Sequence, residues 1–297
     1  MHIRFITKNN TNPAYQGAIT GALAVARQYG AKVDCLAPDI PDDVAQQNEL
    51  IAASLVERPD AIVLLPAHAT GVNHSIDSIN AAGIPLVLIV SEASAGSWIS
   101  YVGTDSEEMA YELGMAMLAT LSDDAHVVIM DGHPGSITTP ERHRGFQRAL
   151  RRHPGMTLLE SVSGDYQQAP ARSAARALLD RHARIDGILV ANDLMAMGVL
   201  QALDEKGRKA SVCSINGTPD AIAEVRRGRL YATASFNTHA FGCLTTEAAI
   251  RHLKGESVPQ RLLLPTTIID TTNAVQWDIP YERRSLPSWR EAQIYAV

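Results

Sequence analysis

Two similar stretches of sequence, RPDAIVLL at residues 58–65 and RIDGILVA at residues 184–191, decide the fold class of this chain. Each is an apolar run of strand length, and the two are offset by 126 residues (186 − 60). Two further pairs keep nearly the same offset: HIRFI at 2–6 with HVVIM at 126–130, and IPLVLIV at 84–90 with ASVCSIN at 210–216. Parallel strands resemble one another by composition, so coincidence is the alternative. Three strands in one order nevertheless predict two copies of one α/β unit.

Apolar runs bounded by turn residues alternate with helical patterns along the chain. The expected strands are residues 3–7, 32–37, 61–65, 86–90, 127–130, 158–162, 187–190 and 212–215. The expected helices are residues 15–29, 44–57, 72–82, 107–121, 141–152, 169–181, 193–206, 219–227 and 241–253. This alternation predicts an α/β protein whose parallel sheets are covered by helices on both faces.

Length and composition exclude several classes of protein. The 297 residues suggest two domains at about 150 residues each. With 46% hydrophobic and 20% charged residues the chain is of ordinary globular composition. The net charge of −6 argues against nucleic acid as a partner, because binding phosphate needs a dense Lys/Arg surface. No apolar run approaches the about 20 residues of a membrane-spanning helix.

Motifs for cofactors and metals are missing from the sequence. There is no GxGxxG and no GxxxxGK[ST], the common phosphate-binding loops. The three cysteines, Cys35, Cys213 and Cys243, form no CxxC, and the ten histidines form no HExxH. No GxSxG surrounds Ser136, and no pair of carboxylates suggests acid–base chemistry. We therefore expect no cofactor, no metal and no catalysis.

The loops that follow the expected strands are the place to look for a ligand, because open α/β sheets bind beyond the carboxyl ends of their strands. These loops carry amides, hydroxyls and aromatic rings with few charges. Amide groups donate and accept hydrogen bonds, which suits vicinal hydroxyls, and aromatic faces suit the C–H faces of a sugar. Each residue also has a plainer interpretation: Asn192 could cap a helix, and Asp105 with Glu108 forms a capping box.

Five segments together resemble the ribose-binding-protein family. They are TNPAY at 11–15, YVGTD at 101–105, ERHRGF at 141–146, NDLMAMGVLQAL at 192–203 and NGTPD at 216–220. The similarity runs from about residue 2 to about residue 270. Any one of the motifs is weak, but their combination is specific.

This resemblance implies a type I periplasmic binding protein. Such a protein has two Rossmann-like lobes, joined by three hinge strands, that clamp a monosaccharide or polyol and deliver it to an ABC importer. The N-terminal lobe would be residues 1–103 plus 237–265, and the C-terminal lobe with the tail would be residues 105–234 plus 266–297. The hinges would fall near residues 103–105, 234–237 and 264–268.

Comparison with that family gives a set of candidate ligand-binding residues, some of which match the family and some of which, such as Lys8, Ser91 and Phe236, replace its residues at the pocket. They are Lys8, Asn12, Tyr15, Ser91, Thr104, Asp105, Thr138, Tyr166, Asn192, Asn216 and Phe236. Several charged or amide positions of ribose binders are replaced: Asp-Arg by Val90-Ser91, an Arg by Pro140, an Asn by Leu65 and a Gln by Phe236. We therefore expect a less polar pocket and a ligand other than ribose, and Lys8 leaves a sugar acid open.

Alternative functions remain on the residues alone. The chain could be a receptor for a signalling or chemosensory partner, or the effector domain of a lac-repressor-type regulator. A regulator of that type carries a DNA-reading headpiece before the first strand, and here residues 2–7 already have the pattern of that strand. An enzyme on a doubly wound fold is a third possibility. We expect a monomer in the periplasm whose leader peptide has been removed, with an ABC transporter permease as its partner.

Overall fold

The computed structural model describes all 297 residues and divides them into two compact units. The first unit is Met1–Thr104, Asn237–Pro265 and Pro280–Val297; the second unit is Asp105–Phe236 and Thr266–Ile279. The chain therefore passes from one unit to the other after residues 104, 236, 265 and 279. The first three passages fall where the three hinge strands were expected, and the fourth was not anticipated.

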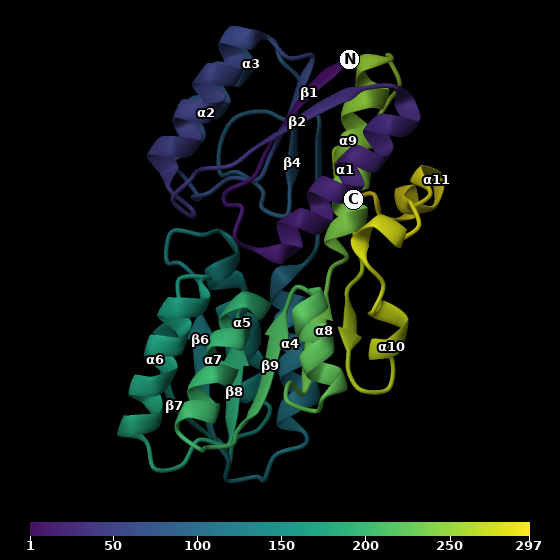
Figure 1. Cartoon of the computed structure of the whole chain (residues 1–297). Helices are drawn as coiled ribbons and strands as arrows, with labels where there is room; N and C mark the ends of the chain where they lie inside the picture. The colour runs from purple at the N-terminus through teal and green to yellow at the C-terminus, as the bar shows by residue number, and fades with distance from the viewer. The chain divides into compact units, whose positions relative to one another are not determined.

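The first unit contains a six-stranded parallel sheet in the order β11-β5-β4-β3-β1-β2. Its strands are β1 (His2–Ile6), β2 (Lys32–Leu36), β3 (Ala61–Leu64), β4 (Leu86–Ile89), β5 (Ser100–Gly103) and β11 (Arg261–Leu263). Its main helices are α1 (Pro13–Tyr29), α2 (Val44–Glu57), α3 (Asn73–Ala81) and α9 (Thr238–Leu253). Helices α1 and α9 pack together, and so do α2 and α3 (Figure 1). Every residue of β3 and β4 is buried, as their unbroken apolar runs require in a sheet covered on both faces.

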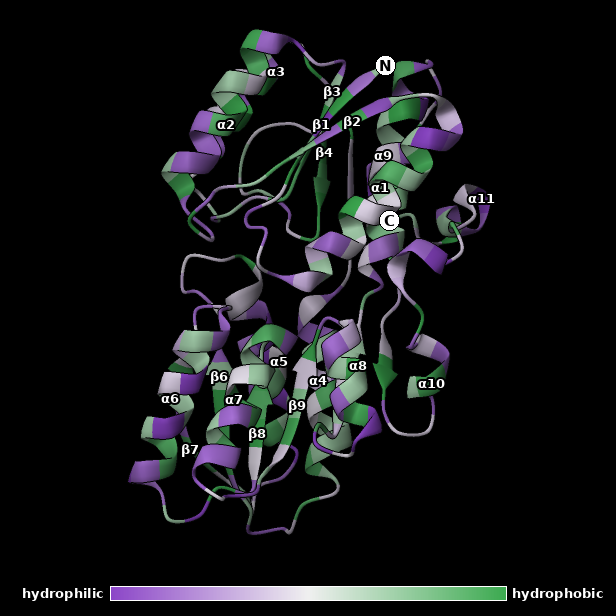
Figure 2. Cartoon of the chain, viewed as in Figure 1, coloured by the Kyte–Doolittle hydropathy of each residue, from purple (hydrophilic) through white to green (hydrophobic).

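The second unit repeats this plan in the order β12-β10-β9-β8-β6-β7. Its strands are β6 (His126–Asp131), β7 (Thr157–Ser163), β8 (Gly187–Val190), β9 (Ser211–Ile215), β10 (Ala232–Ser235) and β12 (Thr267–Ile269), of which only β12 is antiparallel to its neighbour. Helices α4 (Ser106–Leu118) and α5 (Thr138–Leu150) pack together, as do α6 (Gln168–Arg181) and α7 (Asp193–Glu205), and α8 (Pro219–Arg226) packs against β10. Figure 2 shows apolar residues along β8 and mixed faces on α6.

The internal duplication is confirmed by hydrogen bonds as well as by strand order. In the first unit the Asp60 carboxylate accepts from the His2 backbone N–H at 2.6 Å, and the Asp60 N–H donates to the His2 carbonyl at 2.8 Å. In the second unit Asp186 makes the same two bonds to His126, at 2.7 and 2.8 Å. The stretches that carry these aspartates are the ones that match at the 126-residue offset.

The end of the tail packs in the first unit, so its expected place with the C-terminal lobe is wrong for residues 280–297. The Tyr281 ring lies against Gly17 of α1, where an added Cβ would come within 2.7 Å of Cε1. Trp289, at the start of α11 (Trp289–Ala292), lies 5.1 Å from the Arg251 guanidinium carbon, measured to the ring centroid. The Val297 N–H donates to the Arg261 carbonyl at 3.2 Å. Burial of these aromatic rings holds the tail here, while α10 (Ala274–Trp277) stays with α8 in the second unit.

Features that would mark other protein classes are not seen. None of the helices combines the length and apolar composition needed to cross a bilayer. All three cysteines are free thiols. No three histidine, cysteine, aspartate or glutamate side chains gather as a metal site would require.

Candidate functional site

Unusual backbone conformations gather where the strands end. Seven residues other than glycine have positive φ, and six of these follow strands β2, β4, β7, β9 and β10: Asp42, Val90, Asp165, Tyr166, Asn216 and Asn237. Each such conformation costs of the order of 1–3 kcal/mol and persists only where the surroundings fix it. Strain of this kind concentrates at ligand sites, and here it lies in both units at the carboxyl edge of the sheet.

In the first unit, the loop between β1 and α1 is ordered by its own amides. Asn12 caps α1: its Oδ1 accepts from the Ala14 N–H at 3.0 Å. The Asn9 Oδ1 accepts from the Asn12 N–H at 3.1 Å, and the Asn9 amide donates to Asp42 at 2.9 Å. Tyr15 lies buried in the first turn of α1. Capping thus occupies the carbonyl oxygen of Asn12.

Lys8 forms an ion pair with Asp42 at the same edge. The Lys8 Nζ lies 3.6 Å from the Asp42 Oδ1, and the two side chains are only 4% and 3% exposed. Asp42 follows the edge strand β2 and was not among the expected site residues. The rule that named the other loops would have found it, had it been applied to the residues after the second strand.

A strained turn ends β4. The Ser91 N–H donates to the Ile89 carbonyl at 2.7 Å, which closes a three-residue turn around Val90 at φ 66°. Left-handed backbone is rare for a β-branched residue such as valine. The Tyr101 hydroxyl donates to the Val90 carbonyl at 3.0 Å and helps to hold the turn. Ser91 is 3% exposed at this position.

In the second unit, the Tyr166 ring is fixed from several sides. Its hydroxyl shares a hydrogen bond with Thr138 Oγ1 at 2.9 Å. The ring lies against Gly132, where an added Cβ would come within 2.0 Å of Cζ, so no larger residue fits there. The Arg142 guanidinium carbon lies 5.9 Å from the centroids of both the Tyr166 and the Phe236 rings, within cation–π range. The structure thus brings together Thr138, Tyr166 and Phe236 around an arginine that the sequence analysis did not select.

Asn192 and Asp193 organise the loops after β8 and β9. The Asn192 Oδ1 accepts from the Met195 N–H at 2.9 Å, so Asn192 caps α7, and its amide donates to the Tyr166 carbonyl at 3.3 Å. Asp193 is fully enclosed and accepts four hydrogen bonds, from Ser214 Oγ, Thr233 Oγ1, Thr218 Oγ1 and the Thr218 N–H, at 2.5 to 3.0 Å. Burial is the main cause that raises the pKa of Asp193, and these hydrogen bonds oppose it.

Asn216 occupies the most unusual backbone position of the second unit. Its φ is 142°, its side chain is buried, and its N–H donates to the Ala234 carbonyl at 2.8 Å. The next residue, Gly217, has φ 68° and donates its N–H to Thr233 Oγ1 at 3.0 Å. Since Thr233 also donates to Asp193, the buried carboxylate is linked through Thr233 to the backbone of the residue that follows Asn216.

Two of the expected ligand residues have structural partners. The Thr104 hydroxyl donates to the Leu264 carbonyl at 2.8 Å, which ties the ends of β5 and β11. Asp105 caps α4 by accepting from the Glu108 N–H at 2.8 Å, but the Glu108 carboxylate binds Arg148, so the N-cap forms without the reciprocal bond of a capping box. Capping and strand pairing therefore account for the geometry of both, and ligand contact by either one stays a prediction.

A half-buried acid–base pair lies at the end of β6 and was not expected from the sequence. The His143 Nδ1 lies 2.9 Å from the Asp131 Oδ2. Burial raises the pKa of Asp131, and the neighbouring His143 opposes that shift. Asp131 and His143 come from different elements, β6 and α5, so their pairing carries no spacing signal in the sequence.

The fold and the loop chemistry together define a binding protein built of two repeated α/β units. The chain belongs to the periplasmic binding protein domain family, whose profile matches residues 3–257. It is 28% identical over 255 residues to a ribose import binding protein of Bacillus subtilis, covering 86% of this chain and 82% of that one. It is 26% identical over 281 residues to a D-apiose import binding protein of Paraburkholderia graminis, covering 93% and 89%.

A crystal structure shows the same fold. It is that of an ABC transporter solute binding protein from Mycobacterium smegmatis with bound glycerol, which superposes with a TM-score of 0.86 at 28% identity. The match covers 93% of this chain and 96% of that one. This likeness, together with the family profile, confirms the expected type of two-lobed α/β fold.

Proposed function

We propose that this chain is an extracytoplasmic receptor that binds one monosaccharide or sugar alcohol and delivers it to an ABC importer. Family membership supports the binding role, and the names of the relatives support a sugar or polyol as the ligand. The observation that carries the proposal is the set of amide, hydroxyl and aromatic groups held in strained loops at the carboxyl edge of each sheet.

The chemistry of these groups suits a hydroxylated ligand. A hydroxyl both donates and accepts, and Asn, Thr and Tyr side chains offer both functions at short reach. The Tyr166 ring is fixed by contacts with Gly132 and Thr138, so a sugar face can stack on it with little loss of side-chain entropy. Lys8, Asn12, Tyr166 and Asn216 are the residues that we propose to contact the ligand.

We propose binding without catalysis, with the chain acting as a monomer. Two carboxylates near the strand ends already have fixed partners: Asp42 is bound by Asn9 and Lys8, and Asp193 by three hydroxyls and a backbone N–H. In this proposal neither carboxylate serves as a general base. Incubation of a bound sugar with the protein should therefore return the sugar unchanged.

A thermal-shift screen over pentoses, hexoses, deoxy sugars, alditols and sugar acids tests the proposed ligand class. A ligand at about 1,000 times its dissociation constant adds about 4 kcal/mol of stability. In a chain of this length that raises the unfolding midpoint by roughly 5–15 °C. A shift of that size with a sugar or alditol supports the proposal. A folded protein that shifts with none of these compounds, after removal of any co-purified ligand by unfolding and refolding, contradicts it.

A further inference from the structure

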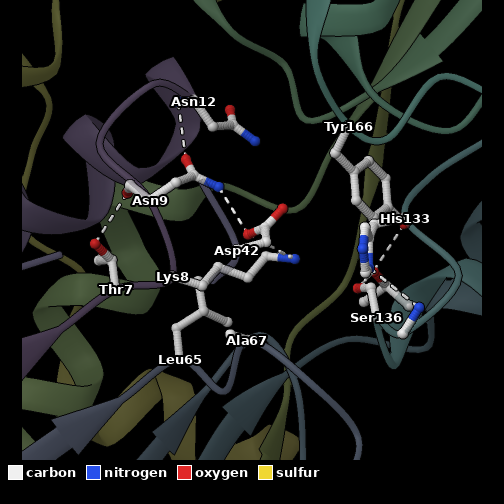
Figure 3. Close-up of polar contacts among 12 residues, drawn as sticks. Thr7, Lys8, Asn9, Asn12, Asp42, Leu65, Ala67, His133, Ser136 and Tyr166 are labelled. Atoms are coloured by element: carbon white, nitrogen blue, oxygen red, sulfur yellow. Dashed lines mark hydrogen bonds and ion pairs between the residues drawn. The ribbon is translucent and has the colours of Figure 1, made fainter. Parts of the chain in front are cut away.

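Lys8 and Asp42 form a buried ion pair that the sequence analysis did not predict. Lys8 follows β1 and Asp42 follows β2, the outermost strand of the first sheet. Figure 3 shows the Asp42 carboxylate between the Asn9 amide and the Lys8 ammonium group. The Asn9 amide donates to the same Oδ1 that faces the ammonium, at 2.9 Å against 3.6 Å for Lys8 Nζ.

The backbone around the pair is tied down, so its geometry is set before any ligand arrives. The Asp42 N–H donates to the Lys8 carbonyl at 2.8 Å, which joins the two loops directly. The Gln47 amide, fully buried on α2, donates to the carbonyls of Thr7 and Leu65 at 3.1 and 2.9 Å. Asp42 itself is held at φ 61°, a conformation that aspartate and asparagine adopt more readily than most residues.

The ion pair determines the net charge that a ligand would encounter after strands β1 and β2. An isolated buried ammonium would attract a carboxylate, because an ion removed from water needs a counter-charge. Here Asp42 already supplies that charge, so the pair is neutral overall. A ligand carboxylate placed near Lys8 would lie within a few ångströms of Asp42 and be repelled. A hydroxyl is compatible with both partners, since it can accept from the ammonium and donate to the carboxylate.

The other charged groups near the strand ends have their own partners. In the first unit, Glu92 after β4 is bound by Arg261 at 2.9 Å. In the second unit, Arg142 donates to the Ala191 carbonyl at 2.5 Å, and it lies close to the rings of Tyr166 and Phe236 and is only 4% exposed. The charge of Glu92 is therefore compensated by Arg261, whereas Arg142 has a backbone carbonyl and two rings as partners and no carboxylate in an ion pair.

We propose that the Lys8–Asp42 pair makes the receptor selective for neutral polyhydroxylated ligands and excludes sugar acids of the same carbon skeleton. This inference rests on the proposed function and narrows its ligand class. Lys8 alone would be compatible with a sugar acid as the ligand. The negative charge of Asp42 is the feature that disfavours a sugar acid.

The test compares ligands that differ in one terminal group, ribitol with ribonate and xylitol with xylonate, by calorimetric titration. Wild-type protein should bind the neutral member of the better pair at least about tenfold more tightly than the acid. In Asp42→Asn the ammonium loses its counter-charge, and the preference should fall by at least about tenfold or reverse. Asparagine tolerates the left-handed backbone at this position and can still accept from Asn9, so the variant should fold.

Two further variants complete the design. Asp180→Asn removes the carboxylate of an exposed Lys–Asp pair, with Lys206, on helices α6 and α7, and its preference should equal that of wild type. Lys8→Gln removes the cation and should weaken the neutral ligand while leaving the acid excluded. If Asp42→Asn fails to fold, Lys8→Gln decides: stronger binding of the acid by this variant overturns the proposal.

The outcomes separate the proposal from the function on which it rests. A wild-type preference for the acid, or a preference in Asp42→Asn within about threefold of wild type, overturns the selectivity proposal and leaves the receptor function standing. If neither these pairs nor any other sugar or alditol binds wild-type protein, the receptor function itself fails and the selectivity proposal falls with it.

Discussion

Replacing Asp193 by alanine should destabilise the second unit by about 2–4 kcal/mol. The variant removes an acceptor of four hydrogen bonds from a site without solvent access. The three hydroxyls can turn toward other acceptors, but the Thr218 N–H cannot move without the backbone. A buried donor left unsatisfied costs about 1–3 kcal/mol, and a hydrogen bond to a charged group contributes about 1.5–3 kcal/mol. Relief from burying the carboxylate offsets part of this loss, as the raised pKa of Asp193 indicates.

Urea unfolding followed by circular dichroism measures this loss, and a thermal scan should show a midpoint lower by roughly 5–15 °C. The matched control is Asp204→Ala, because Asp204 is 63% exposed and paired with Arg229 on the surface. Exposed pairs of this kind contribute about 0–1 kcal/mol. If Asp193→Ala were within about 1 kcal/mol of this control, the assigned role of the buried carboxylate would be refuted.

Three further outcomes follow from the same contacts. Burial raises the pKa of Asp193 above its ordinary value of 3.8, so the folded state binds the carboxyl proton more tightly than the unfolded state does. Compared with Asp193→Asn, wild type should therefore lose stability in urea titrations as pH rises from 3.8 through the raised pKa. A difference in stability between the two proteins that does not change with pH would contradict this. Gly242→Ala places a Cβ 1.8 Å from the Ala18 carbonyl oxygen and should lower stability by about 1–3 kcal/mol by overpacking α1 against α9; an unchanged melting point would exclude that contact. Trp289→Ala should destabilise the tail by roughly 3 kcal/mol and expose residues 280–297 to protease, and equal cleavage of variant and wild type would refute the packing.

Much of the fold could be predicted because buried segments have a characteristic pattern of apolar residues in the sequence. Strands β3 and β8 are covered on both faces, so their apolar runs were visible both as strands and as a repeat. Strands β5 and β10, with the sequences SYVG and ATAS, have the same length but were missed because they are rich in small or polar residues. Tertiary packing buries them, and their composition does not reveal this burial.

The candidate site was only partly predictable for a related reason. The rule that ligands bind after strands selected the loops that contain Lys8, Asn12 and Asn216, and the family comparison selected these residues within them; all three lie after strands. It could not show that Asn192 uses its carbonyl oxygen as a helix cap, because a cap and a ligand contact need the same residue type at the same place. Applied after the second strand, the rule would have selected Asp42 as a candidate, but it could not show the pairing with Lys8, which depends on the contact between two loops.

The most direct measurement is a calorimetric titration of the strongest hit from the screen into wild-type protein and two variants, one in each unit. Asn12→Asp keeps the capping oxygen and loses the amide donor, and Asn216→Gly removes a side chain from a backbone position that glycine adopts freely. Wild type should bind one ligand per chain, and each variant should weaken that same ligand by about tenfold, the loss of one good hydrogen bond. Two ligands per chain, or a variant that binds the ligand as tightly as wild type does, would contradict the proposed role of these side chains in binding one ligand.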